Sequence, residues 1–172
     1  MTISGLPGSG TSTVAHLVAS ALGLERVDGG AVFRAMAAER GMDVAAFSAV
    51  AESDPTIDVD LDRRLSAIAR AGNVVLESRL AGWIARNEGV PATRVWLDAG
   101  AAERARRVAT REGIDAAAAL AANQAREASE ARRYQLLYGI SIADRSIYDL
   151  VIDTTDLAPD AIAKSIVAAA TR

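Results

Sequence analysis

The sequence predicts an α/β fold in which helices cover both faces of a parallel β-sheet. Short apolar runs alternate along the chain with longer stretches of helical periodicity, the pattern of repeated strand and helix units. The run at residues 74–76, Val-Val-Leu, is continuously apolar, as expected of a buried parallel strand. Glycines and the Asp54-Pro55 step separate these segments, so the sequence itself marks the element boundaries.

Apolar spacing and breaker residues define each predicted element. Strands are predicted at residues 2–4, 24–27, 74–76, 94–97 and 150–152. Helices are predicted at residues 12–22, 31–40, 44–52, 59–71, 101–137 (interrupted near Gly113) and 159–170. The first helix is typical, because Val14, Leu17 and Val18 recur at helical spacing and Gly23 follows its last residue.

Length, composition and charge exclude several classes of protein. The 172 residues fit one domain, and the absence of cysteine excludes disulfides, zinc–thiolate sites and thiol catalysis. A net charge of -3 argues against a nucleic-acid partner. No stretch approaches 18 uninterrupted apolar residues, and the chain starts on a strand-like segment without a leader. We therefore expect a cytoplasmic protein that binds neither nucleic acid nor membrane.

The basic residues are almost all arginine, since Lys164 is the only lysine. A GC-rich coding sequence would explain this bias without any function. The chemical consequence is the same in either case. A side chain that binds an anion here is mostly an arginine, whose planar guanidinium matches phosphate.

A glycine-rich segment between the first predicted strand and helix is the strongest functional motif. It reads Gly5-Leu6-Pro7-Gly8-Ser9-Gly10-Thr11-Ser12-Thr13. Glycines let successive backbone N–H groups turn inward around an anion, and the following helix N-terminus adds partial positive charge. Ser12 occupies the hydroxyl position that holds Mg²⁺ in phosphate-binding loops. The segment predicts a nucleotide phosphate site, and a glycine-rich turn without a ligand is the alternative interpretation.

One position departs from the usual phosphate-loop motif. Thr11 stands where a lysine normally follows the last glycine and stabilises the outer phosphates. A dinucleotide-binding fingerprint fits less well, because its closing position needs a small residue and finds Thr13. The loop on its own therefore predicts phosphate binding more strongly than it predicts catalysis.

Four further motifs resemble the cytidylate kinases, in particular their short archaeal-type (type 2) branch. They are residues 28–34 (Asp-Gly-Gly-Ala-Val-Phe-Arg), 75–83 (a strand and the following loop), the Arg126-Glu127-x-x-Glu130-x-x-Arg133 string, and residues 146–154. With the loop, these matches run in family order from residue 3 to about residue 155. The loop occurs in many kinases, whereas the combination is specific to this family.

The resemblance implies a P-loop nucleoside monophosphate kinase fold with a five-stranded parallel sheet and three layers. It divides the single domain into a core (about residues 1–28, 72–100 and 146–172), a monophosphate-binding part (about 29–71) and a helical lid (about 110–135). It also implies ATP and Mg²⁺, and CMP as acceptor, with dCMP and UMP as open alternatives. Separately, we expect a monomer. The ATP phosphates would lie on the loop residues Gly5, Pro7, Gly8, Ser9, Gly10, Thr11, Ser12 and Thr13, with Mg²⁺ on Ser12.

The acceptor residues are also carried over from the resemblance. Arg34 and Arg79 would bind the phosphate of CMP, with Asp28 and Gly29 beside it. Arg79 follows a strand at the sheet edge where α/β proteins collect ligands. The alternative interpretations are a solvated Arg34 and an ion pair between Arg79 and Glu77.

Arg126, Glu130 and Arg133 are spaced i, i+4 and i+7, so they share one helix face. The family role of the two arginines is to bind the transferring phosphoryl group when the lid closes, while Glu130 binds the ribose. A solvated Arg–Glu helix face is the alternative. Arg132 points elsewhere, and Arg111 is a further lid candidate.

The residues that contact the base are the least determined by the sequence. Asp58, Asp62 and Arg63 fall in the part expected to contact the base, although the exposed face of an amphipathic helix explains them as well. His16 is expected to face solvent. For Trp83, Tyr134 and Tyr138, packing is favoured over stacking on a ligand, and Mg²⁺ would arrive with the nucleotide because no metal-ligand cluster is present.

Two rival functions stay open at this point. The first is a kinase of the same scaffold that acts on another small molecule. The second is a nucleotide-binding protein whose Thr11 marks lost catalysis.

Overall fold

The computed structural model describes residues 1–170, except for the side chain of Ala45. Its strands are β1 (Thr2–Gly5), β2 (Glu25–Asp28), β3 (Val74–Glu77), β4 (Arg94–Asp98) and β5 (Leu150–Asp153). They form one parallel sheet in the order β2-β3-β1-β4-β5, with Ile3 opposite both Glu77 and Val95. The predicted parallel sheet is confirmed, and each strand lies within one residue of its predicted limits.

The helices alternate with these strands along the chain. They are α1 (Thr11–Leu22), α2 (Gly29–Glu39), α3 (Val44–Ser53), α4 (Pro55–Ala71), α5 (Ala81–Asn87), α6 (Ala101–Glu112), α7 (Ala116–Tyr138) and α8 (Pro159–Ala170). The predicted interruption near residue 113 separates α6 from α7: Gly113 ends α6 with φ +69°, and the Asp115 carboxylate caps α7.

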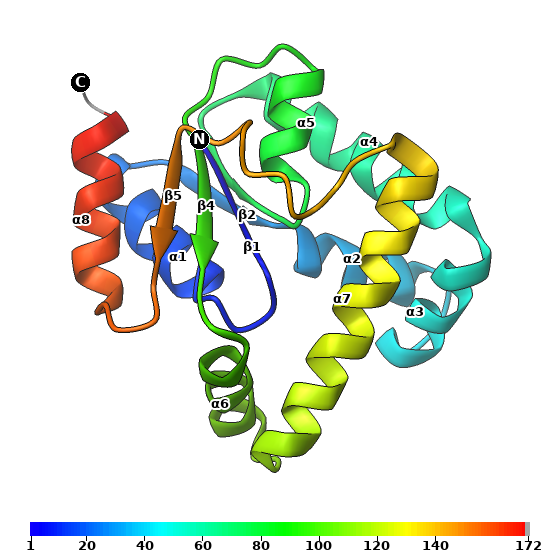
Figure 1. Ribbon diagram of the computed structural model, residues 1–172. Helices are drawn as coiled ribbons and strands as arrows, with labels where there is room; N and C mark the ends of the chain where they lie inside the picture. Colours follow the sequence, from blue (N-terminus) through cyan, green and yellow to red (C-terminus); the bar gives the residue numbers. More distant parts are fainter. Residues whose placement is uncertain (171–172) are drawn as a thin grey trace.

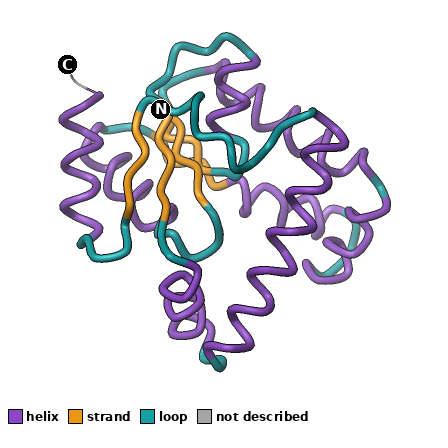
Figure 2. Tube along the Cα trace, viewed as in Figure 1, coloured by secondary structure: helices purple, strands orange, loops and turns teal. Residues whose placement is uncertain are grey.

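Helices cover both faces of the sheet, giving three layers (Figures 1 and 2). Ile3, Val75 and Leu97 belong to the apolar cluster that packs against α1 and α8. Leu76, the neighbour of Val75 in β3, belongs to a second cluster beneath α4 and α5. This alternation follows from the period-two orientation of strand side chains. None of the helices in the described part of the chain is both long and apolar enough to cross a membrane.

One helix was not predicted, and two helices begin several residues earlier than predicted. Helix α5 lies where the resemblance implied only a loop up to residue 83; it starts without a side-chain cap at Leu80 and contains Gly82, so it carries no sequence signal of a helix start. Helix α4 begins at Pro55 rather than at residue 59, because Asp54 caps it and Pro55 suits the first helical position. Helix α2 begins at Gly29 rather than at residue 31, capped by Asp28.

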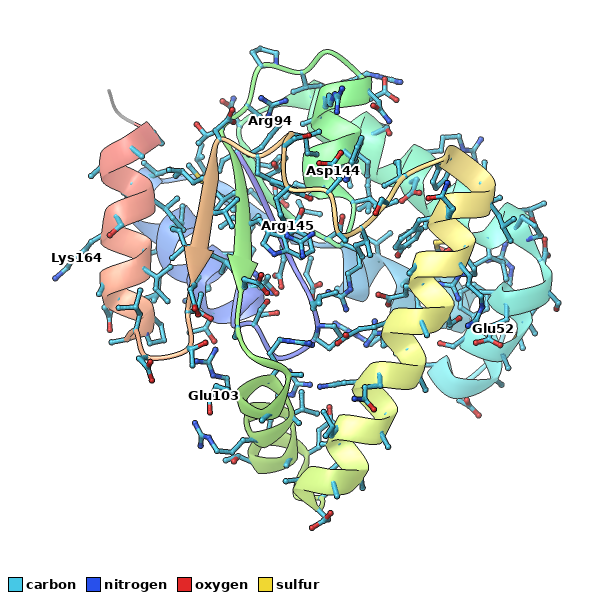
Figure 3. The ribbon with its side chains drawn as sticks, viewed as in Figure 1. Glu52, Arg94, Glu103, Asp144, Arg145 and Lys164 are labelled. Carbon is cyan, nitrogen blue, oxygen red and sulfur yellow. The ribbon has the colours of Figure 1, made fainter. Side chains whose placement is uncertain are left out.

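The carboxyl ends of the strands open onto the remaining helices. Figure 1 shows α6 beyond the arrowheads of β4 and β5, with α7 running from there past α2 and α3. The Ser129 hydroxyl of α7 donates to Glu52 of α3 over 2.8 Å, and Figure 3 shows Glu52 beside α7. Ligands of parallel α/β sheets collect at this edge. The fold therefore places its candidate site between the strand ends, α2, α4 and α7.

Candidate functional site

The glycine-rich loop links β1 to α1 at the centre of this edge. Gly8 and Gly10 have φ values of +83° and +91°, in the left-handed region that other residues adopt at a cost. A Cβ at Gly8 would also collide with the main-chain carbonyl of Arg104. The tight turn therefore depends on these two glycines, and it leaves the N-terminus of α1 facing the loop.

Residues far along the chain hold this loop in place. The Thr154 hydroxyl, just after β5, lies 2.9 Å from the carbonyl oxygens of both Ser9 and Asp98. Arg104 of α6 donates to the carbonyl of Pro7 over 3.2 Å and is almost fully buried. Arg107 donates to the carbonyl of Thr154 over 2.7 Å. The loop is therefore fixed mainly by bonds to its backbone oxygens. Apart from the Ser9 N–H, which donates to the carbonyl of Leu6 over 3.1 Å, the N–H side of the turn is left available to a ligand.

A cavity of about 630 Å³ lies beside the loop, within the size range of small-molecule sites. The loop residues Gly8, Ser9, Gly10, Thr11, Ser12 and Thr13 line it, together with residues 154–159. Arg106, Arg107 and Arg111 line it from α6. Hydrogen bonds from Arg106 and Arg107 lower the pKa of the Glu103 carboxyl to about 2, so this acid is ionised at neutral pH. The cavity combines backbone donors and arginines, as a polyphosphate requires.

Ser12 is joined to an acid that the sequence did not single out as functional. Its hydroxyl donates to Oε1 of Glu77, at the end of β3, over 2.6 Å. Mg²⁺ prefers oxygen ligands, and phosphate-loop proteins hold it between a loop hydroxyl and a strand-end carboxylate. Among residues 1–170 no group of three acidic, histidine or cysteine side chains is arranged to hold a metal unaided. The Ser12–Glu77 pair therefore fits an ion that brings further ligands from a bound nucleotide.

Thr11 begins α1, where the usual lysine would stand. Its methyl group faces the floor of the loop: a Cβ added at Gly5 would meet it at 2.8 Å. The cation nearest to Gly10 comes instead from α6, where Nη1 of Arg107 lies 3.9 Å from the position of a Gly10 Cβ. The positive charge beside the turn is therefore supplied by another element.

Arg79 connects the loop to the other half of the site. Its Nη1 donates to the carbonyl of Gly5, and its Nε donates to Glu130 over 2.7 Å. The alternative pairing with Glu77 is wrong, because Glu77 instead accepts from Arg26 over 2.7 Å. Burial raises the pKa of Glu130, but Arg79 and Arg126 outweigh that effect and hold it below its ordinary value. Glu130 is therefore a buried carboxylate that stays ionised between two arginines.

Asp28, Gly29 and Arg34 lie together where β2 leads into α2. One oxygen of Asp28 caps Gly30 N at 2.8 Å, and the other accepts from Arg34 over 3.2 Å. A Cβ at Gly29 would meet Ser78 Cβ at 2.7 Å, so α2 starts close against the end of β3. The Arg34 side chain is 57% exposed, which leaves it free to reach an anion.

The three residues of the predicted lid lie on one face of α7, as their spacing predicts. Nε of Arg126 donates to Glu130 over 2.8 Å, while Nε of Arg133 lies 2.8 Å from Asp58 of α4. Burial raises the pKa of Asp58 against the lowering effect of Arg133. Arg132 is exposed, as expected. Arg111 pairs with Glu112 and lines the loop cavity rather than this face.

The base-contact candidates divide between two places. Asp58 is buried and faces α7, whereas Asp62 and Arg63 line a second cavity of about 270 Å³ between α4 and α5. Burial raises the pKa of Asp62 to about 6, opposed by the neighbouring Tyr138 hydroxyl. Arg63 is 79% exposed and pairs with Asp60 one turn away. The interpretation as an exposed helix face therefore fits Arg63 and not Asp58.

His16 is exposed, as expected, and Tyr134 packs within the apolar cluster under α4 and α5. Trp83 and Tyr138 pack against the same cluster and also line the second cavity. Sequence reasoning missed Glu77, Arg26, Arg104 and Arg107 as site residues. Glu77 carried a usable signal, since it is an acid at the end of a buried strand. The arginines carried none, because only the tertiary fold brings α6 and β2 to the loop.

Comparison with known proteins agrees with this geometry. The profile of the cytidylate kinase-like family matches residues 1–156. The cytidylate kinase of Methanopyrus kandleri is 47% identical over 167 residues, covering 93% of this chain and 86% of that protein. That of Halobacterium salinarum is 49% identical over 163 residues, covering 94% and 84%.

Among solved structures, the shikimate kinase of Bacteroides thetaiotaomicron superposes with a TM-score of 0.63 at 14% identity, covering 98% of this chain and 93% of that one. An identity this low supports a shared fold only. The fold is that of the P-loop kinases, as the sequence predicts. The chain belongs to the cytidylate kinase-like family.

Proposed function

We propose that this protein transfers the γ-phosphoryl group of ATP to CMP, with Mg²⁺ bound to the nucleotide. Relatives that are nearly half identical over most of the chain carry the name cytidylate kinase. One contact in the site carries the proposal further. Arg79, the acceptor-side arginine, donates to the carbonyl of Gly5 in the phosphate loop. A phosphate on Arg79 and a triphosphate on the loop would therefore be neighbours.

Phosphoryl transfer requires positioning and charge stabilisation more than covalent chemistry from the protein. In our proposal an oxygen of the CMP phosphate attacks the γ-phosphorus, and the bond to the bridging oxygen breaks to leave ADP. The nucleophile is already ionised, so no protein base is needed. Backbone N–H groups from Gly8 to Thr13 would hold the donor phosphates. Mg²⁺, when bound at Ser12 and Glu77, supplies charge neutralisation for the donor.

The acceptor would be held by residues that are now paired with carboxylates. Arg34 and Arg79 would bind its phosphate beside Asp28 and Gly29. Glu130 would bind the ribose, and Asp58 would lie toward the base. Arg126, whose side chain is 63% exposed, is the lid arginine with most freedom to reach the transferring group. Arg133 would join it by exchanging Asp58 for phosphate. In this scheme residues 29–71 are the acceptor-binding part and residues 110–135 the lid.

The proposal covers the remaining expectations from the sequence. We place the protein in the cytoplasm as a monomer acting on free nucleotides, with dCMP and UMP as alternative acceptors. Thr11 removes one cation from the loop, and a charge-stabilising donor of this kind is worth roughly 10²–10³ in rate. We assign part of that role to Arg107, which lies beside the turn, and to Arg126 of α7.

A coupled ADP-release assay tests the proposal. Mg·ATP is offered with CMP, dCMP, UMP, AMP and GMP, for the natural chain and for Thr11→Lys. We expect turnover with the cytidine nucleotides and at most slow turnover with AMP and GMP. Turnover with another acceptor alone would replace CMP by that substrate. No turnover by the natural chain, together with turnover by Thr11→Lys, would show that catalysis was lost at that position. No turnover by either protein with any acceptor would exclude the proposed kinase activity.

A further inference from the structure

Arg26 lies on β2, outside every motif that indicated a site, yet it binds the acid that faces the phosphate loop. Its Nε and Nη2 atoms lie 3.2 Å and 2.7 Å from Oε2 of Glu77. The other Glu77 oxygen accepts from Ser12 over 2.6 Å. Both oxygens of a side chain that is only 7% exposed are therefore fixed, one by each partner.

The same guanidinium also faces the acceptor side. Nη2 of Arg26 lies 3.7 Å from Oδ2 of Asp28, the oxygen that also accepts from Arg34. Ser12, Glu77, Arg26, Asp28 and Arg34 thus form an unbroken chain of polar contacts. It runs from the proposed Mg²⁺ ligand at the loop to the proposed acceptor arginine.

Strand register explains why a cation is needed at this point. Asp28 and Glu77 are direct partners in the β2–β3 pairing, so two carboxylates stand side by side at the strand ends. Arg26 is two residues before Asp28 and projects from the same face of the sheet. Like charges placed directly opposite each other destabilise a strand pair. Without Arg26, both acids would be free to turn away from their present partners.

We infer that Arg26 is a positioning residue that couples the donor half of the site to the acceptor half. The inference rests on the proposed function and deepens it. Arg26 holds Glu77 in the orientation that serves the metal side of the donor. It also holds Asp28, which in turn orients Arg34 toward the acceptor phosphate. Arg26 itself touches neither nucleotide.

The simpler interpretation is an ion pair that only stabilises the edge strand β2. Arg94 provides a matched control for that role. Its Nε and Nη2 both donate to Asp149 (3.2 Å and 2.8 Å), it also lies on a strand, and it is 28% exposed against 29% for Arg26. Figure 3 places Arg94 at the end of the sheet away from Glu103 and the loop. Arg94→Gln therefore removes a similar two-bond pair without touching the site, although Asp149 is 43% exposed and Glu77 only 7%.

The test compares Arg26→Gln, Arg26→Lys and Arg94→Gln in the full chain. Calorimetry gives the Kd of ATP in the presence of Mg²⁺ and in the presence of EDTA. The Kd with EDTA divided by the Kd with Mg²⁺ measures the metal's contribution to binding without any turnover. We expect Arg26→Gln to reduce that ratio by about 5- to 30-fold, the lower part of the range of about 5- to 150-fold that is typical of coupling between sites. Arg94→Gln should leave the ratio unchanged. Arg26→Lys keeps the charge, and we expect it to restore the melting temperature but only part of the ratio.

A second readout follows the acceptor side. The Kd of CMP is measured with and without a non-hydrolysable Mg·ATP analogue. Arg26→Gln should reduce the gain in CMP affinity that the analogue causes by a similar factor. Equal EDTA-to-Mg²⁺ ratios for Arg26→Gln and Arg94→Gln would overturn the inference. If Arg26→Gln does not fold, Arg26→Lys replaces it, and a ratio equal to that of Arg94→Gln would overturn the inference in the same way. A natural chain that binds Mg·ATP without phosphorylating CMP would refute the proposed function alone, because the metal ratio still decides the role of Arg26.

Discussion

The donor and acceptor halves of the site differ in how far backbone contacts hold their arginines. On the donor side, Arg104 and Arg107 pair with Glu127 and Glu103 and also donate to the backbone carbonyls of Pro7 and Thr154. On the acceptor side, Arg34, Arg79 and Arg133 are paired with the carboxylates of Asp28, Glu130 and Asp58, and Arg79 also donates to the carbonyl of Gly5. A ligand can bind the donor loop without breaking those backbone contacts. A phosphate can bind the acceptor arginines only by sharing them with carboxylates or displacing the carboxylates.

This difference indicates which half is built before ligands arrive. The loop is supported by a buried sheet and by Thr154, which is 1% exposed. The acceptor half is assembled from α2, α4 and α7. Apolar clusters join these helices, and charged pairs such as Arg133–Asp58 are added between α4 and α7. We expect substitutions on the acceptor side to act mainly on CMP affinity and rate, and substitutions in the loop to act on ATP affinity and folding.

The largest effect is expected from Arg79→Gln, which removes the arginine where the halves meet. The loss of a charge-stabilising donor should lower kcat/KM for CMP by roughly 10²–10³. The Kd of ATP should change by less than about threefold, because the loop keeps its backbone donors. Steady-state kinetics and calorimetry give the two numbers. Arg132→Gln, which changes an exposed arginine of α7, is the control. If Arg79→Gln weakened ATP binding by as large a factor as it lowered kcat/KM for CMP, the distinction between the two halves would be removed.

An intermediate effect is expected from Gly8→Ala on the donor side. The new Cβ would collide with the carbonyl of Arg104, so either the loop or α6 must move. Alanine would also have to adopt the φ of +83° that Gly8 has. We expect the free energy of unfolding to fall by about 1–3 kcal/mol and the Kd of ATP to rise at least roughly tenfold, which corresponds to about 1.4 kcal/mol.

Gly23→Ala separates the backbone cost from the collision. Gly23 has a φ of +64° and open space around its Cβ position, so it reports conformational strain alone. It should cost about 1 kcal/mol in stability and nothing in ATP affinity. Denaturant unfolding and calorimetry on both variants test this. Unchanged ATP affinity in Gly8→Ala would mean that the turn is not the donor site.

The two halves also differ in how much the sequence revealed. The donor loop was predictable because its chemistry is local: glycines, a hydroxyl and a helix start are contiguous between Gly5 and Thr13. The strands were predictable for the same reason, since short apolar runs between breakers are local patterns. Helix α5 was not, because Leu80 gives it no capping side chain and Gly82 weakens it.

On the acceptor side, the resemblance pointed to most of the residues that the structure brings together, but it also pointed to Asp62 and Arg63, which line another cavity, and it did not give the pairs that the others form. The resemblance pointed to Arg79 and Glu130, yet 51 positions separate them, and no spacing rule predicts their 2.7 Å contact. Glu77 and Arg26 are joined by strand register across the same number of positions. Such partners follow from the strand order and register of the sheet. The sequence predicts that the sheet is parallel, but not which residues of neighbouring strands lie opposite each other.

The last prediction is a gain in stability, expected from Asp62→Asn on the acceptor side. Burial raises the pKa of Asp62 from 3.8 to about 6, so the folded state binds more protons than the unfolded state between about pH 4 and pH 6. Stability therefore falls as pH rises through that window, and the whole penalty is present at pH 7.5. Asparagine cannot ionise, so it should raise the free energy of unfolding at pH 7.5 by about 1–2 kcal/mol and have little effect at pH 4.

Urea unfolding of the natural chain and the variant between pH 4 and pH 8 measures this difference. Arg63→Ala, at the next position of α4 and 79% exposed, is the control and should change stability by less than about 0.5 kcal/mol at any pH. CMP kinetics of the same variants then separate two roles for Asp62. An unchanged KM would make it a buried acid that costs stability without recognising the base. A KM raised tenfold by Asp62→Asn, with the stability gain intact, would instead mean that the acceptor half retains an unfavourable buried charge because it binds the substrate.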